Sequence, residues 1–122
     1  MNMPLSRSYK ETIKARVERD PAFRAALFEE SIKAFLEGDT SVGKALLRDL
    51  VNSTIGFEGL ADELHKPSKS LHRMLAPAGN PTMENLFQVI HALKQNQGID
   101  IEFTSTVKRS AKVRKNTAVA RA

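Results

Sequence analysis

The amino-acid sequence predicts an all-α fold, a five- to six-helix bundle, followed by a short C-terminal strand and a basic disordered tail. Three observations predict this fold class. Apolar residues recur at three- and four-residue steps through most of residues 20–97. Capping residues and glycines stand at the ends of these apolar stripes. Only one stretch, residues 99–104, alternates apolar and polar side chains with a period of two.

Composition limits the class of protein. The chain has 122 residues, of which 41% are hydrophobic, so it suits one domain with its own core. It has no cysteine, which excludes a disulfide scaffold and a thiolate zinc site. No apolar run approaches the roughly 20 residues that span a membrane, and no apolar block follows the first basic residues. We therefore expect no membrane segment, no secretory signal and a cytoplasmic location.

Charge is distributed unevenly and suggests three parts: an arm and short helix (1–19), a helical domain (20–104) and a flexible tail (105–122). The tail has six basic and no acidic residues, whereas the domain has twelve acidic against eight basic residues. Basic tails commonly bind nucleic acid, and this one would add sequence-independent affinity. A tail that only increases solvation is the alternative. Because it has few large apolar groups, we expect it to be disordered when unbound.

The first two helices are predicted from spacing and capping. Residues 1–8 have no periodic pattern and are expected to form a flexible arm, and residues 9–19 form a short polar helix. Asp20 and Pro21 then suit the N-cap and first position of a helix over 21–37, which Gly38 ends. The apolar stripe of this helix contains Phe23, Leu27, Phe28, Ser31, Ile32, Phe35 and Leu36.

The middle of the chain predicts three further helices. Residues 39–41 offer an N-cap for a helix that continues to about residue 54. Gly56 separates it from a shorter helix that ends near His65, because Pro67 disfavours helical geometry at the residue before it. Ser68 is expected to cap the next helix, whose apolar side contains Leu71, Met74 and Leu75.

A last helix and a strand complete the prediction. A rigid turn at residues 77–81 leads to Asn80 or Thr82 as the N-cap of a helix that Gly98 ends. Its inward side is expected to contain Met83, Leu86, Phe87, Ile90 and Leu93. The strand at 99–104 cannot satisfy its own backbone hydrogen bonds, so it must pair with a second copy, a partner protein or another segment.

Residues 57–75 predict a helix-turn-helix unit, in which the second helix enters the DNA major groove. Ala61 lies where the two helices approach closely. Arg binds guanine through two donors, and Lys and Ser contact phosphates or bases. A residue at the start of the following helix is expected to hold a phosphate. The predicted DNA-binding residues are Ser68, Lys69, Ser70, His72, Arg73, Asn80 and Thr82. An ordinary helix pair with a polar outside is the alternative.

Three runs, residues 56–64, 68–75 and 79–82, resemble the addiction-module antidote family, which comprises phage-repressor-like helix-turn-helix antitoxins. Residues 35–39 and 46–50 resemble the leading helices of that family. The resemblance implies a type II antitoxin that neutralises a cognate toxin, a RelE-like mRNA interferase, and represses its own promoter as a homodimer on double-stranded DNA. The turn departs from this pattern at His65, where relatives usually have glycine because a positive φ is often needed, and at Lys66, where they usually have an apolar residue. Either the turn geometry differs slightly or this protein tolerates strain there.

Two other functions remain open: a stand-alone transcriptional repressor without a toxin, and a protein-interaction module that has lost DNA binding. In a dimer, pairing of the lone strand across a two-fold axis would place the recognition helices about 34 Å apart. The three histidines form no ligand pair, and no phosphate loop or catalytic triad is evident. We therefore expect no enzyme activity, no metal and no cofactor.

Overall fold

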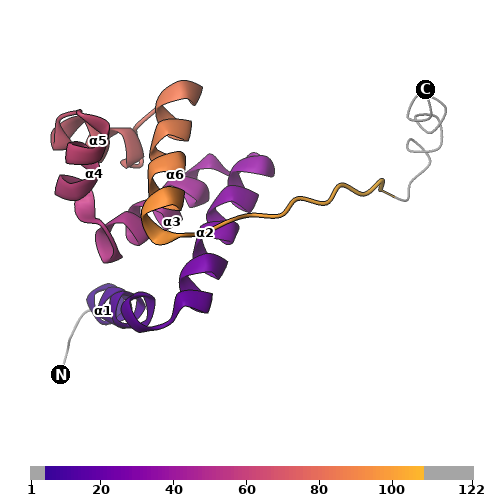
Figure 1. Ribbon diagram of the computed structural model, residues 1–122, viewed down its shortest axis with the longest axis horizontal. Coiled ribbons are helices and arrows are strands. Elements are labelled where there is room, and N and C mark those ends of the chain that lie inside the picture. The colour runs from indigo at the N-terminus through magenta and orange to yellow at the C-terminus, as the bar shows by residue number, and fades with distance from the viewer. Residues whose placement is uncertain (1–4, 109–122) are drawn as a thin grey trace.

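The computed structural model describes residues 5–108, which form six helices and no strand (Figure 1). The predicted tail beyond residue 108 lies outside the described residues. The all-α prediction is confirmed, and no described helix is long and apolar enough to cross a membrane. The helices are α1 (Leu5–Arg19), α2 (Pro21–Leu36), α3 (Thr40–Ser53), α4 (Gly56–Leu64), α5 (Ser68–Leu75) and α6 (Met83–Gln97).

The first helix is longer than predicted. It begins at Leu5, so the flexible arm expected over residues 1–8 is wrong for residues 5–8. These four residues include neither proline nor glycine, and nothing in them stops a helix from extending towards the N-terminus. The lack of an apolar stripe hid this first turn from the sequence pattern.

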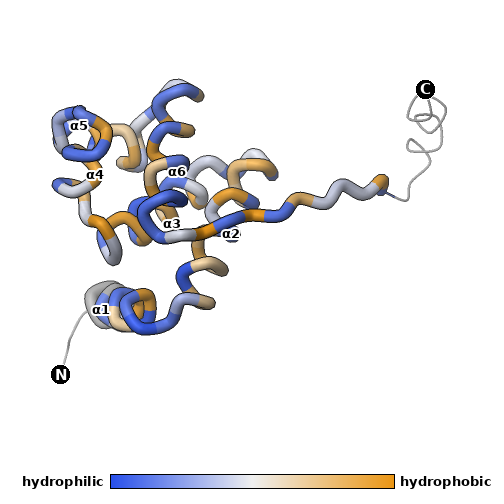
Figure 2. Tube along the Cα trace, viewed as in Figure 1, coloured by the Kyte–Doolittle hydropathy of each residue, from blue (hydrophilic) through white to orange (hydrophobic). Residues whose placement is uncertain are grey.

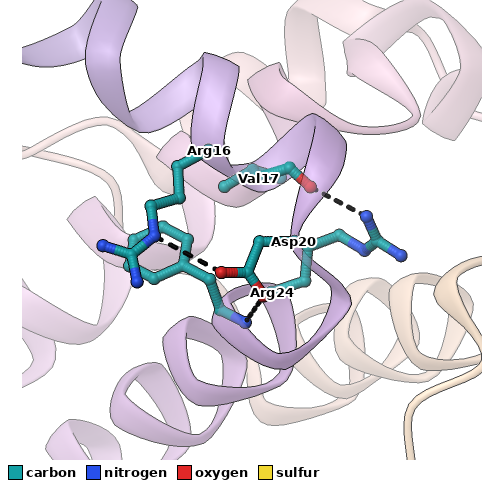
Figure 3. A network of polar contacts seen from close by, with 5 residues as sticks. Arg16, Val17, Asp20 and Arg24 are labelled. Carbon is teal, nitrogen blue, oxygen red and sulfur yellow. Dashed lines mark hydrogen bonds and ion pairs between the residues drawn. The ribbon is translucent and has the colours of Figure 1, made fainter.

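A network of polar contacts fixes the corner between α1 and α2 (Figure 3). Asp20 is the predicted N-cap: its Oδ1 accepts from the Phe23 backbone N–H at 3.1 Å. That hydrogen bond, with the Arg16 guanidinium, holds the pKa of the Asp20 carboxyl below its ordinary value. The Arg16 guanidinium also lies 4.6 Å from the centre of the Phe23 ring. Arg24 donates from Nη1 to the Val17 carbonyl at 2.8 Å, which ties α2 back to α1.

The α2–α3 pair forms the frame of the domain, because α3 contacts α1, α2, α4 and α5. Gly38 has a φ of 85°, as expected of a helix-ending glycine, and Asp39 caps α3. The helices then approach very closely. A Cβ on Gly43 would lie 2.9 Å from the Phe35 ring, and the buried Ser31 Oγ donates to the Gly43 carbonyl at 3.3 Å.

All six helices contribute to one core. Its largest fully buried side chains are Phe28, Leu47, Leu50, Leu60, Leu71, Leu75, Leu93, Val17, Val51, Val89 and Ser31. Two expectations for α6 are wrong, because Met83 is 73% exposed and Phe87 55% exposed. Leu36 at the end of α2 is also 72% exposed. The apolar stripes of α2 and α6 are wider than the faces that their neighbours cover, and Val89 and Ala92 occupy the inner side of α6 instead.

The segment after Gly98 is extended but unpaired. It projects from the helical body as a straight trace, along which apolar and polar residues alternate (Figures 1 and 2). Ile99 is buried and Ile101 packs against the core, whereas residues 102–108 are exposed. The strand predicted over 99–104 is therefore not formed among the described residues, because no second segment lies alongside to share its hydrogen bonds.

We predict that Gly43→Val lowers the free energy of unfolding by about 1–3 kcal/mol, because the added side chain has to displace the Phe35 ring from the α2–α3 contact. Urea denaturation followed by circular dichroism measures the change. Ser41→Val is the matched control, since Ser41 is exposed on the same helix. Equal stability of the two variants would contradict the close approach.

Candidate nucleic-acid interface

A three-residue turn joins α4 to α5. His65 ends α4 in the left-handed region, with φ 55° and ψ 45°, and is the one non-glycine residue with a positive φ in the described chain. Of the two alternatives for this turn, the positive φ at His65 agrees with a strained residue in the usual turn conformation. The Lys66 backbone N–H donates to the Ala61 carbonyl at 3.1 Å, and Pro67, at φ −65° and ψ 139°, is the N-cap of α5. The prediction that Ser68 caps this helix is wrong, because Ser68 is already its first residue and no side chain caps α5. Ala61 is buried, as predicted.

The buried face of α5 determines which of its side chains point outward. Leu71, Met74 and Leu75 lie in the core. With 100° between successive residues, Lys69 and Arg73 fall on the opposite side of the helix, and both are exposed. These two cations are four positions apart (i, i+4), so they lie one turn apart and present one basic surface to the solvent.

Ser68 and His72, also predicted to contact DNA, have partners on α4. Ser68 Oγ donates to Glu58 Oε2 at 3.1 Å. The His72 ring stacks on the buried Phe57 ring, with the centroids 4.0 Å apart and the planes inclined by 23°. These contacts lie on the flank of α5 that faces α4, so they fix how α5 is rotated about its own axis.

The other flank of α5 faces a groove of about 550 Å³ at the beginning of α6. Ser70 and Arg73 line it together with Asn80 and Thr82, so the structure brings together four of the seven predicted residues. Thr82, rather than Asn80, is the N-cap of α6, and its Oγ1 accepts from the Asn85 N–H at 3.1 Å. Its hydroxyl hydrogen remains available as a donor, and the Asn80 side chain is exposed.

Two basic residues of α3, which the sequence patterns did not single out, position this groove. Lys44 is only 7% exposed, and its Nζ donates to the carbonyls of Pro77 at 3.1 Å and Gly79 at 2.6 Å. Arg48 Nη1 donates to the Leu75 carbonyl at 2.6 Å. Cations are favoured at a helix C-terminus because unpaired carbonyls concentrate negative charge there. Their four-residue spacing was visible in the sequence, but their targets lie 27–35 residues away along the chain.

Gly79 allows the loop after α5 to fold back against the end of that helix. Its N–H donates to the Ala76 carbonyl at 2.8 Å. A Cβ at this position would lie only 2.2 Å from the Arg73 carbonyl oxygen and 2.5 Å from that of Met74. No side chain fits there without moving backbone, so glycine is required for Asn80 to lie beside Arg73.

The charge of the exposed side chains differs between α4 and α5. The exposed side of α4 has Glu58, Asp62 and Glu63, whereas α5 has Lys69 and Arg73. A polyanion is therefore attracted to the outward side of α5 and repelled by that of α4. This asymmetry limits the orientations in which a charged partner can approach.

Comparison with known proteins provides no further assignment: no family model, curated protein or solved structure matches this chain. Within residues 5–108, no group of three histidine or carboxylate side chains is placed to hold a metal ion. The site is therefore defined by the geometry of α4, α5 and the loop before α6.

We predict that His65→Gly raises the free energy of unfolding by about 1 kcal/mol, because glycine adopts the left-handed conformation without the steric cost that a Cβ imposes. Urea denaturation measures the gain. His91→Gly is the control and should have the opposite effect. His91 is exposed in the interior of α6, where the lower helix propensity of glycine should reduce the free energy of unfolding by about 0.5 kcal/mol. A loss of stability in both variants would contradict the strain at His65.

We predict that Lys44→Met lowers the free energy of unfolding by about 1–2 kcal/mol, because it leaves the Pro77 and Gly79 carbonyls without their donor. Thermal and urea denaturation measure the loss. Lys94→Met is the matched control: it removes a lysine whose partner, Asp100, is almost fully exposed, and should cost less than about 1 kcal/mol. Similar losses in the two variants would show that Lys44 does not fasten the loop.

Proposed function

We propose that this protein binds double-stranded DNA at a specific sequence, with α4, the turn and α5 acting as a helix-turn-helix and α5 as the recognition helix. The observation that carries the proposal is the outward face of α5. It presents Lys69 and Arg73 opposite its buried side, and Asn80 and Thr82 lie beside Arg73 across one groove. A short helix held firmly on a core and basic on its free side suits the major groove.

The surroundings of each side chain suggest its role in the proposed complex. Arg73 reads a guanine through two parallel donors, and Lys69 contacts a base or phosphate one turn earlier. Ser70, Asn80 and Thr82 donate to the sugar-phosphate backbone, where such contacts set the register of the protein on the duplex. Ser68 and His72 serve mainly to hold α5 against α4, because Glu58 and Phe57 already engage them.

The biological context follows from the resemblance described above. We propose a type II antitoxin that represses its own promoter and neutralises a RelE-like toxin encoded beside it. The negative net charge of residues 20–104 supports a basic, RNA-cleaving partner, because opposite charges speed and orient association. Without such a toxin gene, the same DNA-binding surface describes a stand-alone phage-type repressor.

We predict that Arg73→Ala weakens binding to the DNA upstream of the gene by about tenfold to a hundredfold, because one bidentate base contact is lost. Fluorescence anisotropy at several salt concentrations, with a shuffled duplex alongside, separates specific from charge-driven binding. Lys14→Ala is the matched control, since it removes one exposed positive charge from α1 and should leave the preference for the upstream DNA intact. If the wild type binds both duplexes equally, the proposed recognition helix is wrong.

The toxin assignment has its own test. The reading frame next to the gene is expressed alone and together with this chain, and growth and messenger-RNA integrity are recorded. The proposal expects growth arrest and cleaved messenger RNA with the neighbour alone, and recovery of both on co-expression. A neighbour without effect on growth would overturn the toxin partnership and leave the repressor function, which the DNA-binding assay tests separately.

A further inference from the structure

The segment after α6 exposes an extended backbone with unused hydrogen-bonding groups. The Ile99 N–H donates to the Lys94 carbonyl at 3.0 Å, which completes the end of α6. Beyond it, no backbone group of residues 100–108 hydrogen-bonds to another described residue, and the segment contains no turn or bend. A straight backbone with free donors and acceptors is the usual template for pairing with another strand.

The same segment has an apolar side that the protein itself covers only at one end. In an extended chain, the side chains of Ile99, Ile101, Phe103, Ser105 and Val107 lie on one side. Ile99 is buried and Ile101 packs on the core, but Phe103 is 71% exposed and Val107 is 65% exposed. The alternation of side chains therefore continues past residue 104, where the predicted strand ends. Its apolar side extends past the part that the core covers.

We infer that residues 102–108 form an antiparallel strand pair with the same residues of a second copy, around a two-fold axis at Ser105. In this register three kinds of pair each occur twice. Glu102 lies opposite Lys108, Phe103 opposite Val107, and Thr104 opposite Thr106. These are an opposite-charge pair, an aromatic–β-branched pair and a threonine pair, which are the combinations that stabilise antiparallel sheets.

Neighbouring registers make poorer use of the same residues. An axis at Phe103 places Glu102 opposite Thr104 and leaves Lys108 without a carboxylate. An axis at Thr104 places Lys108 opposite Asp100, whose Oδ1 already accepts from Lys94 Nζ at 3.0 Å. With the axis at Ser105, Asp100 keeps its partner, and Glu102 and Lys108, which form no ion pair with a described residue, neutralise each other.

The helical body supports one side of the two-stranded ribbon that residues 102–108 of the two copies form. A groove of about 380 Å³ lies between α2 and the extended segment, and Ile32, Leu36, Ile101 and Phe103 are among its lining residues. Leu36 is 72% exposed there. A second copy's Val107, opposite Phe103, lies next to this apolar surface. The contact matters because an isolated two-stranded ribbon is marginally stable in water.

The absence of cysteine from the sequence permits a direct test of the axis. In the full-length protein, Ser105→Cys places two thiols directly across the axis, where Cα atoms of opposed residues are about 4.5–5.5 Å apart and can form a disulfide. We expect a covalent dimer under mild oxidation. Ser41→Cys, exposed on α3, controls for random collision, and Thr104→Cys tests the neighbouring register.

A charge exchange tests the pairing independently. Glu102→Lys and Lys108→Glu each place like charges opposite each other twice, and each should weaken dimerisation about tenfold. The double variant restores both pairs with reversed polarity and should dimerise like the wild type. Sedimentation velocity at micromolar concentration measures all four proteins without DNA, so the result does not depend on the proposed DNA binding.

Each contrary outcome overturns the inference. A monomeric wild type would show that the segment does not pair with its own copy. A dimer in which Ser105→Cys cross-links no faster than Ser41→Cys would place the contact elsewhere, for example at the exposed Met83 and Phe87 of α6. Preferential cross-linking of Thr104→Cys would reject the register, as would a double charge variant no better than the single ones.

Discussion

The candidate interface depends on the hydrogen bonds that two cations of α3 donate to carbonyls at the end of α5 and in the following loop. Lys44 and Arg48 donate to three carbonyls that α5 and the following loop leave unpaired. A short helix has little stability of its own, so its position depends on such tertiary contacts. Because the same cations hold the loop and the helix, Asn80 and Thr82 keep a fixed position relative to Arg73.

Around α5, the side chains that hold the helix in place lie on different sides from those that face the solvent. One side enters the core, the flank towards α4 is held by Phe57 and Glu58, and the remaining arc presents Lys69 and Arg73. Stacking of His72 on Phe57 limits rotation of α5, which matters because a rotation of a few tens of degrees would redirect both cations. Rigid support of this kind is what a surface that reads base edges requires.

Most element boundaries were predictable because their signals are local. Asp20, Asp39 and Thr82 each cap a helix through a side chain that accepts from a backbone N–H three residues later. The same sequence patterns failed on Met83, Phe87 and Leu36, because helical periodicity shows which residues share a side but not how much of that side a neighbour covers. The first turn of α1 was missed because it has no apolar stripe.

The sequence by itself determined the six helices, the place of the turn at His65 and the residue types offered by α5, because capping, periodicity and backbone preference act within a few residues. Only the tertiary structure decided which of the seven predicted residues face outward, since that depends on how α5 rotates against α4. It also revealed Lys44 and Arg48, whose partners lie far away along the chain, and the close approach of Gly79 to the carbonyls at the end of α5. Such contacts arise from packing in three dimensions, which no local pattern encodes.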